Sequence, residues 1–373
     1  MKTVSSRFLT AHAASLPKTI PFVGPEALQR LRGCRFRARL GANESGFGPS
    51  PAALAAMREA VAESWKYPDP ESYELREAIA AFLGVGTDNV VVGVGIDGLL
   101  GLTCALVLDR GDTVVTSDGA YPTFNYHVAC CGGRLLKVPY RDDKEDLAAL
   151  LDTARREHAK VLYVSNPDNP MGSWWSADAI TALTSDLPPT TLLLLDEAYC
   201  DTAPPDAMPP SDVTNPQVLR YRTFSKAYGM AGARVGYCIG DAELIGAFEK
   251  VRNHYSMNYV GQIGALAALR DQEYLAHAVD LIGAARERIA RIAADNGLEA
   301  LPSATNFVAI DCGADAAFAR RVLDETLARD VFIRMPGAAP LNRCIRVTAS
   351  LDAELELLAE VLPEALRAAN AQA

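Results

Sequence analysis

The stretch RTFSKAYGMAGARVGY, residues 222–237, contains the side chains best suited to chemistry. Lys226 follows Thr223 and Ser225 closely, and Arg234 comes eight residues later. A lysine at the end of a β-rich run, among hydroxyls and small residues, suits a Schiff-base amine better than a solvated loop lysine. The two hydroxyls and the arginine could hold a dianionic phosphate beside it.

Two other runs end in side chains that fit the same chemistry. LLLLDEAYCD places Asp196 at the end of an apolar run with Tyr199 three residues on, and VSNPDNPMGS places Asn169 after another run. A buried acid at a strand end costs desolvation free energy unless it meets a cation, and a protonated pyridine nitrogen would be one. Each feature alone has an ordinary explanation, since strand-end acids often cap helices and Asn-Pro pairs often form turns. Together with the lysine they predict a pyridoxal phosphate pocket.

A glycine-rich turn, VVVGVGIDGLLGL at residues 90–102, could cradle a phosphate. Residues 93–98 match G-x-G-x-x-G between a β-branched run and an apolar helical run, and Asp118 follows about 20 residues on, as in the dinucleotide fingerprint. The backbone N–H groups of such a turn, at the start of a helix, bind many kinds of phosphate. By itself the turn fits a nicotinamide dinucleotide as well as a single phosphate.

Alternating apolar strands and helices must position these groups. Strands are predicted at residues 89–93, 112–117, 134–140, 160–165, 191–196, 218–224 and 234–239. Helical patterns separate several of them, at residues 99–108, 144–157 and 176–187. Near-continuous apolar strands separated by helices are typical of a parallel sheet covered on both faces, which is an α/β fold.

The texture changes after about residue 241. Several helical patterns alternate there with the short β-rich runs NFVAIDC, VFIRMP and CIRVTAS, which predicts a smaller α+β unit. We expect an N-terminal arm over residues 1–40 that packs on the small domain, a large domain over 41–262 and a small domain over 263–373.

Composition limits the class of protein. The 373 residues suggest two domains, and a net charge of −10 argues against a nucleic-acid or anionic-membrane partner. The N-terminal stretch lacks the clean apolar core of a signal peptide. The eight cysteines show no C-x-x-C spacing and predict buried thiols in a cytoplasmic protein. No metal site is expected.

Taken together, these motifs resemble the fold-type I pyridoxal phosphate aminotransferases of class I and II, and within them the histidinol-phosphate aminotransferase branch. The resemblance covers most of the chain, from LGANESGFGPSP and KYPDPESYELREAIAAFLGV through SNPDNPMG, LLDEAY and RTFSKAYGMAGARVGY to RCIRVTAS. It implies a large domain with a mostly parallel seven-stranded sheet and a smaller α+β C-terminal domain.

The resemblance also implies a role for each matching residue. Lys226 would form the Schiff base with pyridoxal phosphate and move the proton, while Asp196 would keep the pyridine nitrogen protonated. Tyr199 would be the third catalytic residue. Tyr199 and Asn169 would both hydrogen-bond to the ring oxygen, and Tyr121 would stack on the ring. The remaining cofactor residues would hold the phosphate: Gly95, Ile96, Asp97, Gly98, Thr223, Ser225, Arg234 and, from the other subunit, Tyr67. A shared phosphate site implies a homodimer.

The substrate residues implied by the resemblance are Arg346 as a carboxylate clamp, with Arg334, Asn43, Phe22 and Tyr255 around it. Here the chain departs from the family. Phe22 replaces a tyrosine that helps hold the substrate phosphate, and losing a charge-assisted hydrogen bond costs about 1.5–3 kcal/mol. Arg334 and Arg346 could still hold a phosphate between them, although Arg334 also fits a surface or dimer contact. Asp168 replaces an asparagine, and Met171 a threonine, in the family's Asn-Asn-Pro-Thr-Gly.

The sequence therefore predicts a transaminase that works by a ping-pong cycle. The donor is histidinol phosphate or an aromatic amino acid, whose ring could rest on Phe22 and Tyr255, and the acceptor is 2-oxoglutarate. The competing predictions are a phosphothreonine-type decarboxylase or an amino-acid oxidase on the same fold, and, more remotely, an NAD-dependent dehydrogenase. In the family the glycine turn holds the pyridoxal phosphate, which argues against the dinucleotide.

Overall fold

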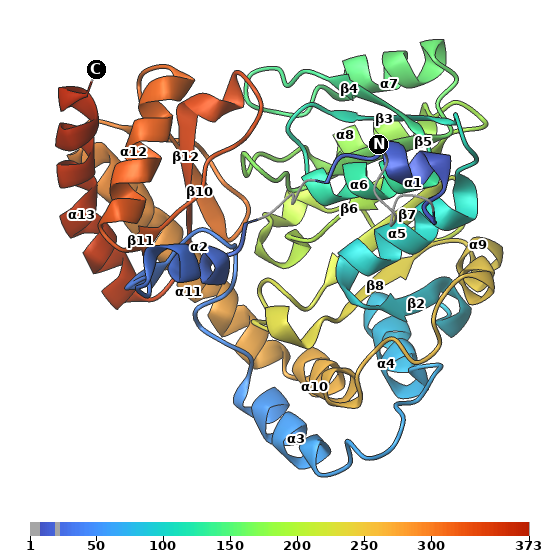
Figure 1. Cartoon of the computed structure of the whole chain (residues 1–373). Coiled ribbons are helices and arrows are strands. Elements are labelled where there is room, and N and C mark those ends of the chain that lie inside the picture. The colour runs from blue at the N-terminus through green and yellow to red at the C-terminus, as the bar shows by residue number, and fades with distance from the viewer. Residues whose placement is uncertain (1–7, 19–22, 373) are drawn as a thin grey trace.

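Two bodies, each with its own β-sheet, lie side by side (Figure 1). The computed structural model describes residues 8–18 and 23–372. Phe22, one of the predicted substrate residues, lies outside the described part of the chain.

The larger body contains a seven-stranded sheet in the order β2-β8-β7-β6-β5-β3-β4. Its neighbours run parallel except for β8, which is antiparallel to both β2 and β7. The strands are β2 (Val90–Gly93), β3 (Thr113–Ser117), β4 (Arg134–Val138), β5 (Val161–Ser165), β6 (Leu192–Asp196), β7 (Val218–Thr223) and β8 (Gly236–Ile239). The prediction of a mostly parallel seven-stranded sheet is confirmed.

Helices cover both faces of this sheet because the strands are apolar on both sides. Along β3, Val114 packs in one core with residues of α5 and α6, whereas its neighbour Val115 packs in another with residues of α7 and α8. This alternation follows from the two-residue period of a strand. The helices are α5 (Gly95–Val107), α6 (Pro122–Cys131), α7 (Leu147–Arg156) and α8 (Ala177–Ser185).

The carboxyl ends of β5, β6 and β7 lie next to one another. Ser165, the last residue of β5, is the register partner of Asp196, and Asp196 is the partner of Tyr221. Thr223 ends β7 at the same edge of the sheet. Ligands of parallel α/β sheets bind beyond this edge, so the topology brings the predicted strand-end residues together.

The smaller body is an α+β unit, as predicted. Its sheet has the antiparallel order β12-β10-β9, and a short parallel pair joins β1 to β11. The strands are β1 (Ala38–Arg39), β9 (Glu299–Ala300), β10 (Phe307–Asp311), β11 (Val331–Phe332) and β12 (Cys344–Thr348), and the helices are α11 (Gln272–Asp295), α12 (Ala316–Ala328) and α13 (Asp352–Ala371). Of the helices described, none is long and apolar enough to cross a membrane.

The predicted domain boundary at residues 262/263 falls inside a helix, α10 (Tyr259–Arg270). Ala265 and Leu269 of α10 are buried in one core with Val90 and Tyr237 of the large sheet. By its packing, α10 belongs to the larger body together with α3 (Pro51–Val61), α4 (Tyr73–Leu83) and α9 (Ala242–Gly246). We therefore place the change of domain after α10, because a helix cannot be divided between two cores at its middle.

The N-terminal arm contacts both bodies. Arg32 of α2 (Pro25–Arg32) forms an ion pair of 2.5 Å with Asp330 of the smaller body, as expected for this arm. The short helix α1 (Ala11–Ser15) instead lies on the larger body, where Nε2 of His12 is 2.8 Å from the backbone oxygen of Ala129 in α6. The expectation that the arm packs on the small domain thus holds only for α2.

Candidate active site

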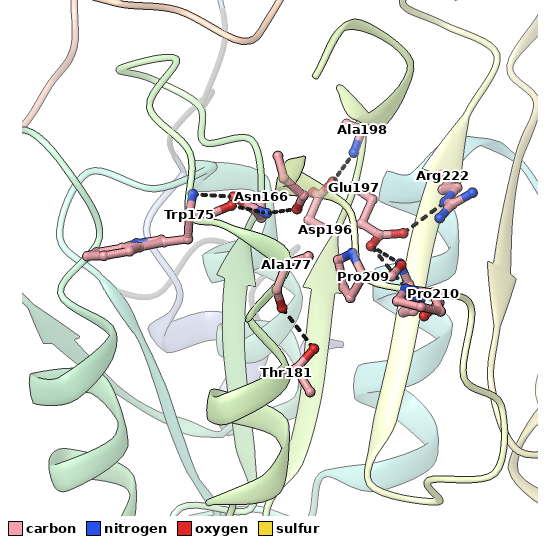
Figure 2. Close-up of polar contacts among 12 residues, drawn as sticks. Asn166, Trp175, Ala177, Thr181, Asp196, Glu197, Ala198, Pro209, Pro210 and Arg222 are labelled. Carbon is pink, nitrogen blue, oxygen red and sulfur yellow. Dashed lines mark hydrogen bonds and ion pairs between the residues drawn. The ribbon is translucent and has the colours of Figure 1, made fainter. Parts of the chain in front are cut away.

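Asp196 ends β6 with its carboxylate held by two hydrogen bonds, of which Figure 2 shows the one from Ala198. The hydroxyl of Tyr163 donates to Oδ2 at 2.6 Å, and the backbone N–H of Ala198 donates to Oδ1 at 2.9 Å. Burial raises the pKa of Asp196 to about 6, although these hydrogen bonds and the charge of Lys226 act against it. A cation placed against this carboxylate would favour its charged form.

The next residue, Glu197, has a different role. Figure 2 shows it directed toward Arg222 rather than toward the partners of Asp196. Its two carboxylate oxygens lie 2.6 Å from Arg220 and 2.8 Å from Arg222. Burial acts to raise the pKa of Glu197, but the two arginines bring it below its usual value. Adjacent acids thus divide into one that is open to a ligand and one that anchors β6 to β7.

Lys226 follows β7 and is partly buried among active-site groups. Its Nζ donates to the backbone oxygen of Asn43 at 3.1 Å and lies 5.4 Å from the centre of the Tyr199 ring. Burial lowers the pKa of Lys226 to about 8, and the positive charges of Arg346 and Arg234 act in the same direction. A substantial neutral fraction near that pH is what an amine needs in order to attack a carbonyl.

Asn43 is hydrogen-bonded to both Lys226 and Tyr199. Its Nδ2 donates to the hydroxyl oxygen of Tyr199 at 2.9 Å, and it is held by Thr348 of β12 through its own N–H. Because the Tyr199 oxygen accepts this hydrogen bond, the tyrosine hydrogen is left to donate to a ligand oxygen. Asn43 was predicted to bind substrate, whereas the structure places it in contact with two of the predicted catalytic residues.

The start of α5 and the end of β7 form an anion cradle. Gly95 has a φ of +71°, and a Cβ there would lie 2.5 Å from Nη2 of Arg234. The hydroxyl of Thr223 donates to Oγ of Ser225 at 2.9 Å, and Arg234 donates to the same oxygen at 3.4 Å. A helix N-terminus, two hydroxyls and a guanidinium in one place suit a phosphate dianion. Gly98 lies further along α5 and, unlike Ile96 and Asp97, does not line the cavity beside this cradle.

These groups surround a cavity of about 250 Å³, which we call the inner cavity. Its lining includes ten of the predicted residues, namely Ile96, Asp97, Tyr121, Asn169, Asp196, Tyr199, Thr223, Ser225, Lys226 and Arg234. The donors, the buried acid and the lysine fit the phosphate, the ring nitrogen and the aldehyde of pyridoxal phosphate. The residues that line the inner cavity therefore fit the cofactor that the sequence predicts.

A second cavity of about 450 Å³, the outer cavity, adjoins the first, since Asn169 lines both. Arg334 and Arg346 lie in it side by side on neighbouring backbone segments. Nη1 of Arg346 donates to Oδ1 of Asn169 at 2.5 Å, while Nε of Arg346 has no partner among the described residues. Burial and the nearby charge of Arg334 lower the pKa of Arg346 to about 10, despite the opposing effect of Tyr199. A negatively charged substrate group would pair with the Nε of Arg346 and offset the repulsion between the two guanidinium groups.

Two predicted residues lie away from both cavities. Tyr67 is 80% exposed and Tyr255 is 54% exposed, and their rings pack together with centroids 4.9 Å apart. Neither lines the inner or the outer cavity of this chain. A cofactor contact for Tyr67 therefore requires a second subunit.

Sequence reasoning missed Tyr163 and Ser165, which lie on the face of β5 next to Asp196. Tyr163 contacts the carboxylate directly, and Ser165 lines the inner cavity. The signal was present in KVLYVS, because residues two apart in a strand share a face and both carry hydroxyls. The sequence does not show which strand lies beside β6, so it could not predict that these two hydroxyls lie next to Asp196.

Comparisons with known proteins agree with this geometry. The aminotransferase class I and II family matches residues 38–362. A histidinol-phosphate aminotransferase of Moorella thermoacetica is 32% identical over 94% of this chain and 91% of its own, and one of Mesorhizobium japonicum is 38% identical over 80% and 83%. The crystal structure of histidinol-phosphate aminotransferase from Sinorhizobium meliloti, in complex with pyridoxal-5'-phosphate, superposes with a TM-score of 0.94 at 55% identity, covering 96% of this chain and 98% of that one.

The chain belongs to the class I and II aminotransferases, a pyridoxal phosphate-dependent family of fold type I. It is an aminotransferase. The predicted family, fold class, enzyme class and cofactor are confirmed, and the decarboxylase, oxidase and dehydrogenase alternatives are not favoured.

Proposed function

We propose that this enzyme binds pyridoxal phosphate in the inner cavity and transfers an amino group from histidinol phosphate to 2-oxoglutarate. The observation that carries the proposal is the placement of Lys226. It lies partly buried after the end of β7, with Tyr199 and the supporting Asn43 beside it and the carboxylate of Asp196 on the neighbouring strand.

Pyridoxal phosphate, when bound, supplies an electrophilic aldehyde and an electron-accepting ring. Asp196 would hold a proton on the ring nitrogen, and Tyr199 and Asn169 would donate to the ring oxygen. The amine of Lys226 would capture the aldehyde and, once displaced by the substrate amine, carry a proton to and from the reacting carbon. One amine with a lowered pKa can serve in both half-reactions.

The outer cavity supports an anionic donor. Arg334 and Arg346 together offer two guanidinium groups for a phosphate or for the carboxylates of the acceptor. Several relatives are histidinol-phosphate aminotransferases, which supports a donor that carries a phosphate. An aromatic amino acid is the competing donor, because the predicted aromatic contact Phe22 offers no hydroxyl.

We further propose a homodimer acting in the cytoplasm. The exposed aromatic pair Tyr67 and Tyr255, with Trp65 at 81% exposure close to Tyr67 in sequence, suits a surface that a second copy covers. All eight cysteines are free, which agrees with a reducing compartment. Cys34 and Cys130 are nevertheless exposed, so the prediction that the thiols are buried was wrong for these two.

The experiment is a half-reaction screen with the purified holoenzyme. Single donors are added and the visible absorption of the bound cofactor is followed, with histidinol phosphate, histidinol, phenylalanine and tyrosine compared. We expect fast bleaching by histidinol phosphate and a rate at least about 10-fold lower with histidinol, since one ionic hydrogen bond to the phosphate is worth about 1.5–3 kcal/mol. Arg334→Gln should remove this preference and leave bleaching by tyrosine unchanged.

Rapid bleaching by phenylalanine or tyrosine with no response to histidinol phosphate would assign the outer cavity to aromatic donors. Release of carbon dioxide or of peroxide would instead mean that the chemistry is not transamination. An absence of bleaching by every donor, in a protein that binds the cofactor, would overturn the proposed reaction.

A further inference from the structure

Two buried carboxyl groups lie beside the active site and have no place in the function proposed above. Glu145, just before α7, is 1% exposed, and Asp168, in the loop after β5, is 2% exposed. The hydroxyl of Tyr140 donates to Oδ1 of Asp168 at 2.7 Å, and the N–H of Met171 donates to Oδ2 at 3.0 Å. Asp168 is also a departure from the family, which usually has an asparagine there.

Glu145 is held less completely. Its Oε1 accepts the backbone N–H of Ser165 at 3.2 Å, while its Oε2 is buried without a hydrogen bond of normal geometry within the described ranges, and the side chains that interact with this carboxyl are the Ser117 hydroxyl and Asp168. An unpaired buried carboxylate oxygen is costly, and two buried carboxylates that face each other are costlier still. A proton on Oε2 would turn the unpaired acceptor into a donor toward Asp168.

The electrostatics assign this proton to Glu145. Burial and the charge of Asp168 raise the pKa of Glu145 well above its usual range. Burial also raises the pKa of Asp168, to about 6, but hydrogen bonds from Tyr140, Met171 and Glu145 and the charge of Arg346 favour its ionised form. Near neutral pH the pair therefore carries one proton and one negative charge.

The loop that begins with Asp168 joins the two bodies at the active site. Asn169, the next residue, accepts the hydrogen bond from Arg346 at 2.5 Å. Met171 packs against Leu341 and Cys344 of the smaller body, and the backbone oxygen of Gly172 accepts the N–H of Ala304 at 2.9 Å. The loop is also fixed at its base, where Asn166 exchanges hydrogen bonds with the backbone of Trp175 (Figure 2).

We propose that Glu145 and Asp168 share one proton and that this carboxyl pair, with Tyr140, is a positioning unit that sets Asn169 and Arg346 for carboxylate substrates. The single negative charge on Asp168 attracts the Arg346 guanidinium and so orients it, while the Nε of Arg346 stays available to a substrate carboxylate. Both groups act through Asn169 and Arg346 rather than on the substrate. The inference rests on the proposed function only for what Arg346 binds.

The first test detects the shared proton directly, in the holoenzyme at pH 8. Infrared difference spectra between the wild type and Glu145→Gln should contain the carbonyl stretch of one protonated carboxyl group. Asp168→Asn should lose the same band, because its amide can donate to Glu145 and allows that residue to ionise. Tyr140→Phe should keep it. A wild-type spectrum without a band that depends on both carboxyls would overturn the proposal, and this readout needs no knowledge of the donor.

The second test separates positioning from a general structural role. Glu145→Gln keeps a donor toward Asp168 and should keep the wild-type KM for 2-oxoglutarate. Glu145→Ala removes the donor and should raise KM about 10-fold, the size expected for a lost hydrogen bond to a charged group, with kcat within about 3-fold and the cofactor absorption unchanged. Tyr140→Phe, which changes little volume, should raise KM in the same direction by a smaller factor, and it serves if the alanine variant does not fold.

Equal KM values for the alanine, glutamine and phenylalanine variants would overturn the positioning role. So would a fall in kcat with KM unchanged. If the enzyme transaminates none of the donors but binds the cofactor and shows the infrared band, the proposed function fails while the shared proton stands.

Discussion

The inner and outer cavities differ in how completely their side chains are paired. Around the inner cavity, Asp196 accepts two hydrogen bonds, and Thr223, Ser225 and Arg234 bond to one another within the larger body. In the outer cavity, the Nε of Arg346 is buried without a described partner, and Arg334 and Arg346 place two like charges together. The first site is arranged in advance for a resident cofactor, whereas the second awaits an anion that comes and goes.

This comparison shows which part of the enzyme determines what. Groups fixed at the ends of parallel strands position the cofactor with little reorganisation. Groups contributed by the smaller body and by the loop after β5 depend on how the two bodies meet. We therefore expect changes in the inner cavity to reduce the rate and changes in the outer cavity to alter the choice and affinity of substrate.

The largest effect is expected from Lys226→Ala. Loss of the amine removes both carbonyl capture and the proton carrier, and general acid–base catalysis alone contributes about 100- to 10,000-fold. Rapid-mixing measurements of the half-reaction should therefore show a fall of at least about 1,000-fold. Lys160→Ala, at a surface ion pair with Asp112, is the matched control and should react like the wild type. A reactive Lys226→Ala protein would remove the central role of the inner cavity.

Glu197→Gln should mainly change stability. It leaves Arg220 and Arg222 buried without their common carboxylate, and breaking a buried ion pair costs about 3–5 kcal/mol. Denaturant unfolding of the cofactor-free protein should show this loss. Glu249→Gln, which removes a half-exposed ion pair with Arg252, should cost less than about 1 kcal/mol. Equal losses in the two variants would show that the Glu197 cluster does not anchor the strands.

In the outer cavity, Arg346→Gln should raise KM for 2-oxoglutarate by roughly 10- to 100-fold, as expected from losing hydrogen bonds to a charged group. The absorption of the bound cofactor should remain, because among the residues that line the inner cavity Arg346 is hydrogen-bonded to Asn169 and not to the groups that would hold the cofactor phosphate or ring nitrogen. Steady-state kinetics and spectra of the same preparation measure both. Lost cofactor binding with normal KM would reverse the assignment of the two cavities.

The smallest effect concerns the pH dependence of reconstitution. The pKa of Lys226 is lowered to about 8 in the cofactor-free protein, so the neutral amine predominates only above that pH. The rate at which added pyridoxal phosphate is captured should rise with pH, bend near 8 and level off above it. In Arg346→Gln the bend should move to higher pH, since the arginine charge lowers this pKa. A profile that is unchanged in this variant would show that the two cavities are not electrostatically linked.

The sequence by itself determined the architecture of the larger body and the chemistry of the inner cavity. Apolar runs, several of them separated by helical patterns, predicted all seven strands, because burial on both faces leaves a continuous apolar signal in the central strands, and only the edge strand β4 is largely unburied. Residues at the ends of those runs, such as Asp196 and Lys226, could then be expected at one edge of the sheet, because the carboxyl ends of parallel strands share an edge. The same signal does not mark where one core ends, which is why the predicted boundary fell inside α10.

Only the tertiary structure decided which groups contact one another across the fold. Asn43 and Tyr199 are 156 residues apart in the chain, and Arg346 and Asn169 are 177 apart, yet each pair is hydrogen-bonded. The contact between Tyr163 and Asp196 follows only from the pairing of β5 with β6. Local pattern fixes how each segment folds because it reflects burial along the segment, whereas the pairing of distant polar groups depends on how strands are ordered and how two bodies pack.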